Sequence, residues 1–190
     1  MEIEAVDRFS PALDELARVS PDSTFYHTGL WVECLARAFP ALRFRVLIAA
    51  EGKRLIGYLP FFETKKGPLT ALWSLPFGTY GGPVTLGDGD VHRDLARAYA
   101  GLRKTRGVHE IGVVDYANRV DPAGFRSEES STHVIDLAGG FESIWEGVFE
   151  KSKRRQTRKE AKDGLTESET RLQEDVAAYY DIYATGIDAW

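Results

Sequence analysis

The chain has 190 residues, of which 43% are hydrophobic and 28% charged, a composition typical of a globular protein and not of a disordered one. Its formal net charge of −5 argues against a protein that coats nucleic acid with its whole surface. The single cysteine, Cys34, excludes an internal disulfide and fits a reducing compartment. The sequence has neither a basic leader followed by an apolar run nor a stretch of ~20 apolar residues. We therefore expect a soluble, cytoplasmic protein.

The first part of the chain predicts two helices followed by a β-hairpin. Ser10-Pro11 is a typical helix start, with an N-cap and a proline in the first turn, and Thr28 is a second N-cap. Cys34 falls on the apolar side of the second helix, where we expect it to be a small buried residue. The predicted elements are helices at 10–18 and 29–39, strands at 43–50 and 54–62 around a Glu51-Gly52 turn, and a third strand at 69–75.

The second part predicts alternating helix and strand. We expect a helix from Val91, capped by Asp90 and ending before Gly107, and an apolar strand at 110–114 that is covered on both faces. Further predicted elements are a strand at 132–137, a helix from Phe141 with its apolar face (Ile144, Trp145, Val148, Phe149) in a core, a basic helix ending at Gly164, and a helix from Glu174 to Trp190.

This order of elements predicts the fold class, an α/β (α+β) sandwich with a mixed sheet. We expect one complete domain over residues 1–137 and the incomplete beginning of a second over 138–190. The last helix has no capping or stop signal before Trp190, which we interpret as a chain cut within an element.

The segment from Lys151 to Lys162 has the most pronounced charge in the sequence. It holds seven basic residues and one acid, a charge of +6 that leaves −11 for the rest of the chain. On a helix, Lys151, Arg155, Arg158 and Lys162 share one face. Such a face suits a pyrophosphate, a nucleotide sugar or an RNA backbone. It equally suits a solvated helix whose last cations complement the helix dipole.

The loop from Ser74 to Pro83 holds three glycines and two prolines after an apolar segment. This composition predicts a shaped loop whose backbone closely approaches either a ligand or a neighbouring element. The loop precedes the Val91 helix, and the N–H groups at a helix N-terminus can hold a pyrophosphate such as that of coenzyme A. No glycine-rich phosphate pattern occurs there, and three aspartates (Asp88, Asp90, Asp94) would repel a pyrophosphate. We do not expect this half to bind coenzyme A.

Other catalytic patterns receive no support from the sequence. The four histidines (His27, His92, His109, His133) have no metal-ligand spacing, so no metal site is expected. There is no Gly-x-Ser-x-Gly elbow and no P-loop. The sequence identifies no catalytic base.

Taken in order, several segments resemble the Fem (FemA/FemB-like) family of aminoacyl and acyl transferases, within the GNAT-like N-acyltransferase superfamily. These segments are Phe25–Trp31, the hairpin Ile48–Pro60, the loop Leu75–Pro83, the strand Val134–Leu137, the basic run Ser152–Gly164 and the helix Tyr180–Trp190. Each motif is loose and their order carries the likeness, which spans nearly the whole chain.

The resemblance implies two tandem GNAT-like domains and a reaction that moves an aminoacyl or acyl group onto an amine, in peptidoglycan cross-bridges or envelope polysaccharides. It implies aminoacyl-tRNA or acyl-CoA as donor. Because residues 1–190 offer neither a coenzyme A loop nor a credible base, we expect them to hold no cofactor and to show no turnover alone. We expect no membrane span, because the sequence has no apolar stretch of sufficient length, and we do not expect DNA as a partner. The residues expected to bind substrate or phosphate are Arg155, Arg158, Lys159 and Lys162 in the basic run and Tyr80, Gly81 and Gly82 in the loop.

Two departures from the peptidoglycan branch predict a different acceptor. Glu33 and Cys34 stand where that branch has a lysine, and Ala189 stands where it has an arginine. The alternatives to an enzyme are a non-catalytic RNA- or phosphate-binding module that uses residues 151–162, and a scaffold that has lost its activity. The basic run has no aromatic residue on which a base could stack, which favours the enzyme.

Overall fold

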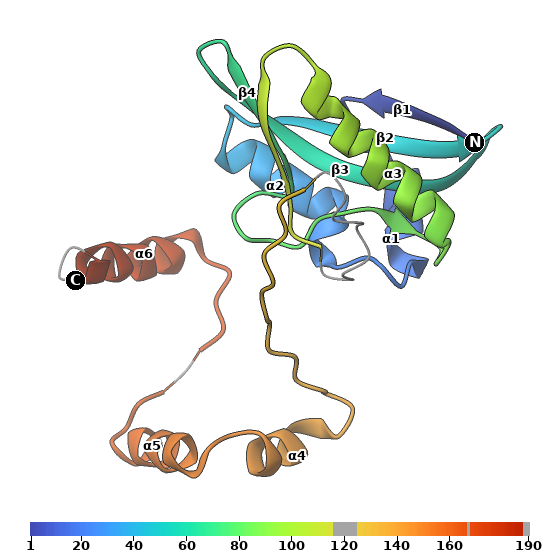
Figure 1. Cartoon of the computed structure of the whole chain (residues 1–190). Coiled ribbons are helices and arrows are strands. Elements are labelled where there is room, and N and C mark those ends of the chain that lie inside the picture. Colours follow the sequence, from blue (N-terminus) through green and yellow to red (C-terminus); the bar gives the residue numbers. More distant parts are fainter. Residues whose placement is uncertain (116–124, 167, 188–190) are drawn as a thin grey trace. The chain divides into compact units, whose positions relative to one another are not determined.

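The computed structural model describes residues 1–115, 125–166 and 168–187. They belong to two compact units, Met1–Glu128 and Glu129–Trp190, and the first unit ends ahead of the predicted boundary at Leu137. Figure 1 shows the elements of both units. In the first unit these are β1 (Glu2–Val6), α1 (Pro11–Val19), η1 (Phe25–His27), α2 (Gly29–Ala38), β2 (Arg43–Glu51), β3 (Arg54–Lys66), β4 (Leu69–Ser74), β5 (Val84–Thr85), α3 (Gly89–Gly101), η2 (Leu102–Lys104) and β6 (Val108–Val113). In the second they are α4 (Gly140–Gly147), α5 (Lys151–Lys162) and α6 (Gln173–Ile187).

The strands of the first unit form one six-stranded mixed sheet. Its order is β1-β2-β3-β4-β6, and the short β5 pairs with β3 beside this path. Neighbouring strands are antiparallel except β4 and β6, which are parallel because α3 crosses between them. The predicted α+β sandwich with a mixed sheet is confirmed.

Helices cover both faces of this sheet. On one face, Leu95 and Tyr99 of α3 pack against Leu47 and Leu59, in a cluster whose members are almost fully buried. On the other face, α1 packs against Val46 and Tyr58, as the alternation of side chains along a strand requires. Helix α2 adds a third cluster on this second face, built around Phe62 and Leu75.

The helix starts predicted in the first unit are largely confirmed. Proline occupies the first turn of α1, and the Thr28 side chain accepts the Trp31 N–H at 3.4 Å at the start of α2. The start of α3 differs from the prediction, because the Asp88 side chain caps it by accepting the N–H groups of Asp90 and Val91. Asp90 lies inside the first turn, where its carboxylate pairs with Arg93.

The prediction of a buried Cys34 is wrong, because this cysteine is exposed. Helix α2 buries Val32 and Leu35 instead. Cys34 lies about 200° around the helix from Val32, on the side that faces away from the sheet. The apolar residues of α2 are spread around the helix, so their spacing alone did not identify the inner face.

Two short strands were not predicted, and one predicted strand is absent from the described chain. Strand β1 forms one edge of the sheet, where it pairs with β2, and β5 has only two residues. Residues 132–137 form no strand, and Val134 and Leu137 are 73% and 72% exposed. No described strand supplies the neighbouring backbone that a strand needs. His109 and Glu110 of β6 are neighbours on opposite faces and both are exposed, so the expected cover on both faces is also wrong.

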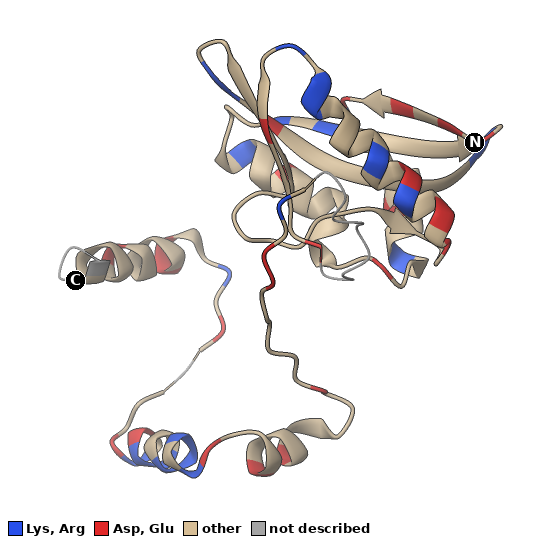
Figure 2. Ribbon diagram, viewed as in Figure 1, with Lys and Arg blue, Asp and Glu red and all other residues tan. Residues whose placement is uncertain are grey.

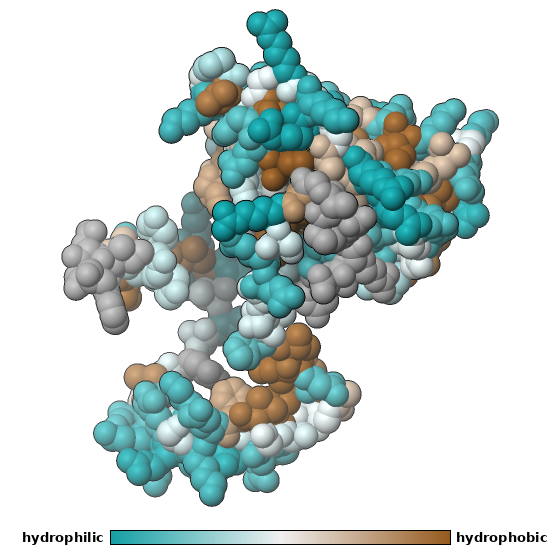
Figure 3. Space-filling view, viewed as in Figure 1, coloured by the Kyte–Doolittle hydropathy of each residue, from teal (hydrophilic) through white to brown (hydrophobic). Residues whose placement is uncertain are grey.

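The second unit contains helices without a buried core among its described residues. The Trp145 ring of α4 stacks on Phe141 and lies tilted against Phe149, with ring centroids 5.7 and 5.6 Å away. Val148 and Phe149 are nevertheless 56% and 42% exposed, so the prediction that this face lies in a core is wrong. Figure 3 shows apolar atoms beside the hydrophilic surface of the basic helix. Among the described residues no helix is both long and apolar enough to cross a membrane.

Candidate functional site

Helix α5 carries the basic segment, and its bounds agree with the prediction. It follows Glu150, which makes no side-chain cap, and the Arg154 guanidinium donates to the Glu146 carbonyl at the end of α4, 3.3 Å away. Gly164 ends the helix with a φ of 86°. The Leu165 N–H donates to the Glu160 carbonyl at 3.1 Å, which completes a glycine-based C-cap. Contacts made by residues of α5 and its immediate neighbours therefore fix both ends of the helix.

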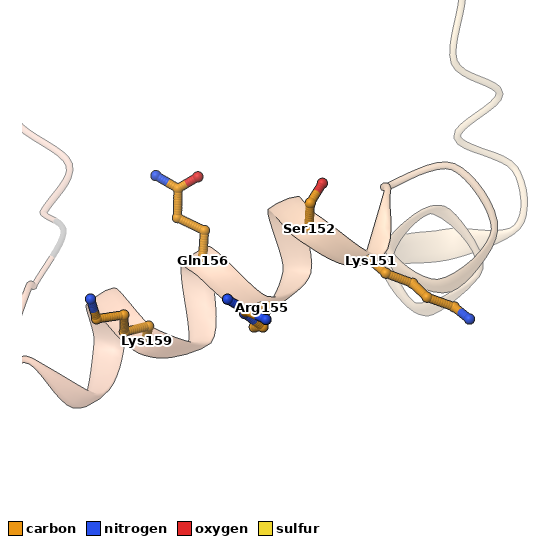
Figure 4. A pocket seen from close by; sticks show the side chains of 5 residues that line it. All are labelled: Lys151, Ser152, Arg155, Gln156 and Lys159. Carbon is orange, nitrogen blue, oxygen red and sulfur yellow. The ribbon is translucent and has the colours of Figure 1, made fainter.

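Most side chains of α5 are exposed, Arg154 and Glu160 are half-buried, and none of its residues is buried. A depression of about 520 Å³ lies along the helix, lined by Lys151, Ser152, Arg155, Gln156 and Lys159. Figure 4 shows three cations, Lys151, Arg155 and Lys159, following one another along the helix beside the polar Ser152 and Gln156. The structure thus places the predicted Arg155 and Lys159 in this depression. Arg158 and Lys162 lie on the same helix but outside its lining.

The cations of α5 lack acidic partners. Among the described residues no carboxylate lies within ion-pair distance of any of the seven. The one acid of the helix, Glu160, instead accepts a hydrogen bond from Gln156 at 3.0 Å. Figure 2 shows the resulting concentration of basic residues. Close like charges repel one another, so α5 carries an unfavourable electrostatic energy that a bound polyanion would remove.

The exposed helices of the first unit are built differently. Each of α1, α2 and α3 pairs its basic side chains with an acid one helical turn earlier. The pairs are Arg18 with Glu15, Arg37 with Glu33, Arg93 with Asp90 and Arg97 with Asp94. Such pairs are ordinary surface features worth a few tenths of a kcal/mol each, roughly 0.2–0.5. Their absence sets α5 apart within the same chain.

The predicted loop residues Tyr80, Gly81 and Gly82 lie in the first unit, at the ends of β4 and β6. The Gly81 N–H donates to the Val114 carbonyl at 2.7 Å, and the Gly82 N–H donates to the Ser74 hydroxyl at 2.9 Å. A Cβ at Gly81 would lie 2.3 Å from the Ser74 carbonyl oxygen. The close backbone approach expected of this loop is therefore made to the chain's own strands. A role of these residues in ligand binding stays a prediction.

His27 lies fully buried beside this loop, and no sequence pattern singled it out. Its Nδ1 is 3.0 Å from the backbone nitrogen of Thr24, in the capping box of η1. Burial lowers the pKa of His27 to about 4, outweighing the Gly81 backbone and the Asp115 charge, which raise it. The imidazole is therefore neutral at pH 7 and is part of the packing that holds the loop.

Tyr80 extends an aromatic cluster on the same side of the first unit. Its ring lies 5.8 Å from that of Tyr26, which in turn lies 5.2 Å from Trp31. Phe77, in the same loop, packs against Phe39 at 4.5 Å and adopts a positive φ of 70°. A left-handed phenylalanine is strained by roughly 1–3 kcal/mol, so the surrounding contacts fix the loop. No group of three or more His, Cys, Asp or Glu side chains suited to a metal occurs in the described parts of the chain.

Comparison with known proteins adds little to this geometry. No family model and no curated protein matches the chain. Two crystal structures of TTHA1254 from Thermus thermophilus, a point mutant and the wild type, are similar to it. They share 17% and 18% sequence identity with TM-scores of 0.42 and 0.41, and each alignment covers 71% of this chain and 98% of that protein.

Proposed function

We propose that the chain binds a phosphate-bearing substrate through α5, as part of a transferase that moves an acyl or aminoacyl group onto an amine. The observation that carries the proposal is the set of exposed cations on α5 that have no acidic partner among the described residues. Ordinary surface helices of this chain neutralise their cations locally, whereas α5 keeps them available.

A phosphate-bearing ligand fits these cations better than a single carboxylate does. The row of Lys151, Arg155 and Lys159 presents three positive charges one helical turn apart, which a monoanion cannot neutralise. Guanidinium groups bind phosphate oxygens through paired hydrogen bonds. Because α5 is a formed helix with a glycine cap, its backbone loses little freedom when a ligand binds.

The transferase part of the proposal rests on the ordered resemblance to the Fem family and accords with the mixed-sheet fold. A cell-envelope precursor with a nucleotide or pyrophosphate group, or the phosphates of an aminoacyl-tRNA, would supply the anion. The alternative is a non-catalytic module that binds RNA or phosphate through the same helix. The absence of aromatic residues between Lys151 and Gly164 in the sequence favours the enzyme, because single-stranded RNA sites usually combine cations with stacking platforms.

Binding is tested with tripolyphosphate and with tRNA, titrated into the wild-type chain at two salt concentrations. Arg155→Ala, in the lining of the depression, should weaken binding about tenfold, since a hydrogen bond to a charged group is worth roughly 1.5–3 kcal/mol. Arg158→Ala, on the same helix but outside that lining, should weaken it less. Two controls accompany it. Glu160→Ala should leave the affinity equal or slightly higher, and Arg97→Ala, on a helix whose arginines already have partners, should leave it unchanged. If Arg155→Ala binds like wild type at both salt concentrations, α5 is an ordinary solvated helix.

A transfer assay distinguishes the proposed transferase from the alternative, a non-catalytic binding module. A protein that contains this chain is incubated with radiolabelled aminoacyl-tRNA or acyl-CoA and an amine-bearing envelope precursor. The transferase is supported if label is transferred to the amine and if Arg155→Ala loses transfer in proportion to its loss of binding. Binding without transfer to any acceptor amine supports the non-catalytic module.

A further inference from the structure

A second concentration of positive charge lies in the first unit, where β1 ends and β2 begins. A solvent-open pocket of about 380 Å³ is lined there by Ala5, Val6, Asp7, Arg8, Arg43 and Arg45. The pocket belongs to residues of the first unit alone. It is therefore independent of the phosphate-binding role proposed for α5.

The sheet register explains why three arginines meet at this place. Val6 pairs with Val46, so the residues that follow β1 continue past the first residues of β2. Arg43 and Arg45 are two apart on β2 and therefore point to the same face of the sheet. Arg8, from the segment after β1, completes the lining.

These arginines have too little acid around them to be a structural ion-pair cluster. Asp7 is the one carboxylate of the lining, and Glu63, opposite Arg43 in the register, pairs with Lys65 at 3.6 Å. Among the described residues, none of the three arginines has a carboxylate within ion-pair distance.

Arg45 gives the clearest sign of a missing ligand. Its Nε is buried and makes no hydrogen bond with any described group. A buried donor without an acceptor costs free energy, and a charged one costs more than a neutral one. Folding stability alone therefore does not explain why an unsatisfied Arg45 Nε–H lies beside two further guanidinium groups.

We propose that this pocket binds a phosphate group, either inorganic phosphate or pyrophosphate or the phosphate of a small monoester. The net charge of the lining, three arginines against one aspartate, matches a dianion. A lone carboxylate would leave part of this charge uncompensated. Guanidinium forks from two directions can bind different oxygens of one phosphate, and the Arg45 Nε–H gains the acceptor that it lacks.

The test uses the 190-residue chain with Arg155→Gln and Arg158→Gln as background, so that α5 contributes little to phosphate binding. Pyrophosphate, inorganic phosphate and ribose 5-phosphate are titrated by calorimetry, which distinguishes free phosphate from a monoester as the source. Adding Arg45→Gln to this background should weaken binding about tenfold or more, because the buried charged contact is lost. Arg45→Lys should also weaken it, because an ammonium group cannot reproduce the fork. Arg97→Gln is the matched control and should have no effect.

Thermal unfolding provides the second readout. Without phosphate, Arg45→Gln should melt at the same temperature as its parent or higher, because it removes like-charge repulsion and an unpaired buried donor. Phosphate should raise the melting temperature of the parent and not that of the variant. If Arg45→Gln does not fold, Arg43→Gln takes its place with the same expectations.

The proposal is overturned if the background chain binds none of the three probes more tightly than chloride, or if both arginine variants bind like their parent. It is also overturned if the variants melt lower and keep full binding, since the arginines are then structural. Failure of the α5 variants in the binding test described above leaves this pocket unaffected, because the two sites share no residue.

Discussion

Helices α3 and α5 have 13 and 12 residues, and both carry several charged side chains. In α3 the charges form i,i+3 pairs on the outer side, while Leu95 and Tyr99 are buried against the sheet. In α5 no residue is buried and no described acid pairs with a cation. Packing and ion pairs within the fold thus explain the side chains of α3. They do not explain the cations of α5, and for this reason we propose that α5 binds a ligand.

The largest effect expected from this comparison is a loss of stability in α3 without a loss of binding. Leu95 is completely buried, so Leu95→Ala should lower the free energy of unfolding by about 3–4 kcal/mol through lost burial and a cavity. Urea unfolding measures the change. Tripolyphosphate affinity, measured under conditions where the variant remains folded, should stay the same. A parallel loss of affinity would show that the two helices are not independent.

The next effect is an acid sensitivity confined to the first unit. The pKa of His27 is about 4 in the folded chain against 6.5 for a free histidine, so the unfolded chain binds more protons between these values. The contribution of the neutral His27 to stability is therefore fully present above pH 6.5. As the pH drops toward 4, this group lowers the free energy of unfolding by about 3 kcal/mol. Urea titrations at pH 7.5, 5.5 and 4.5, monitored by tryptophan fluorescence, measure the fall. His27→Gln cannot take up the proton and should show a shallower pH dependence; an equal slope in both proteins would refute the assignment.

The smallest effect comes from making α5 resemble α3. Ser152→Glu places an acid in the first turn, one helical turn before Arg155, where both the helix dipole and the new pair are favourable. The substitution should stabilise the helix by roughly 0.3–0.8 kcal/mol. Circular dichroism should detect the resulting increase in helix content. Tripolyphosphate binding should weaken several-fold over the same range of salt. Ser152→Gln adds a side chain of similar size without charge and should leave binding unchanged.

Much of the first unit could be predicted because local signals and tertiary packing agree there. Ser10-Pro11, Thr28 and the Glu51-Gly52 turn all mark the ends of elements in the structure. The wrong predictions concern segments whose structure depends on pairing with residues far away in the sequence. The alternation at 132–137 finds no partner strand among the described residues, and β1 becomes a strand only by pairing with β2.

The two candidate sites also differ in how far the sequence alone predicts them. The basic face of α5 lies within one helix, so the sequence predicted its cations, including Arg155 and Lys159 of the depression. The arginine pocket needs Arg8 from one segment and Arg43 and Arg45 from another. Once residues 43–50 are predicted as a strand, the alternation of side chains places Arg43 and Arg45 on the same face. What it lacked was the register of β1 that brings Arg8 beside them.

Strand β1 also protects the sheet from unwanted association. Along its length it occupies the hydrogen-bonding groups of β2 from Val46 to Ala50, next to some of the most buried apolar residues of the molecule. A chain lacking residues 2–6 would present this row of N–H and C=O groups as an open edge, the usual template for strand addition between molecules. With β1 in place the open edge is instead a five-residue strand that carries Glu2 and Glu4, and a short, charged edge disfavours strand addition.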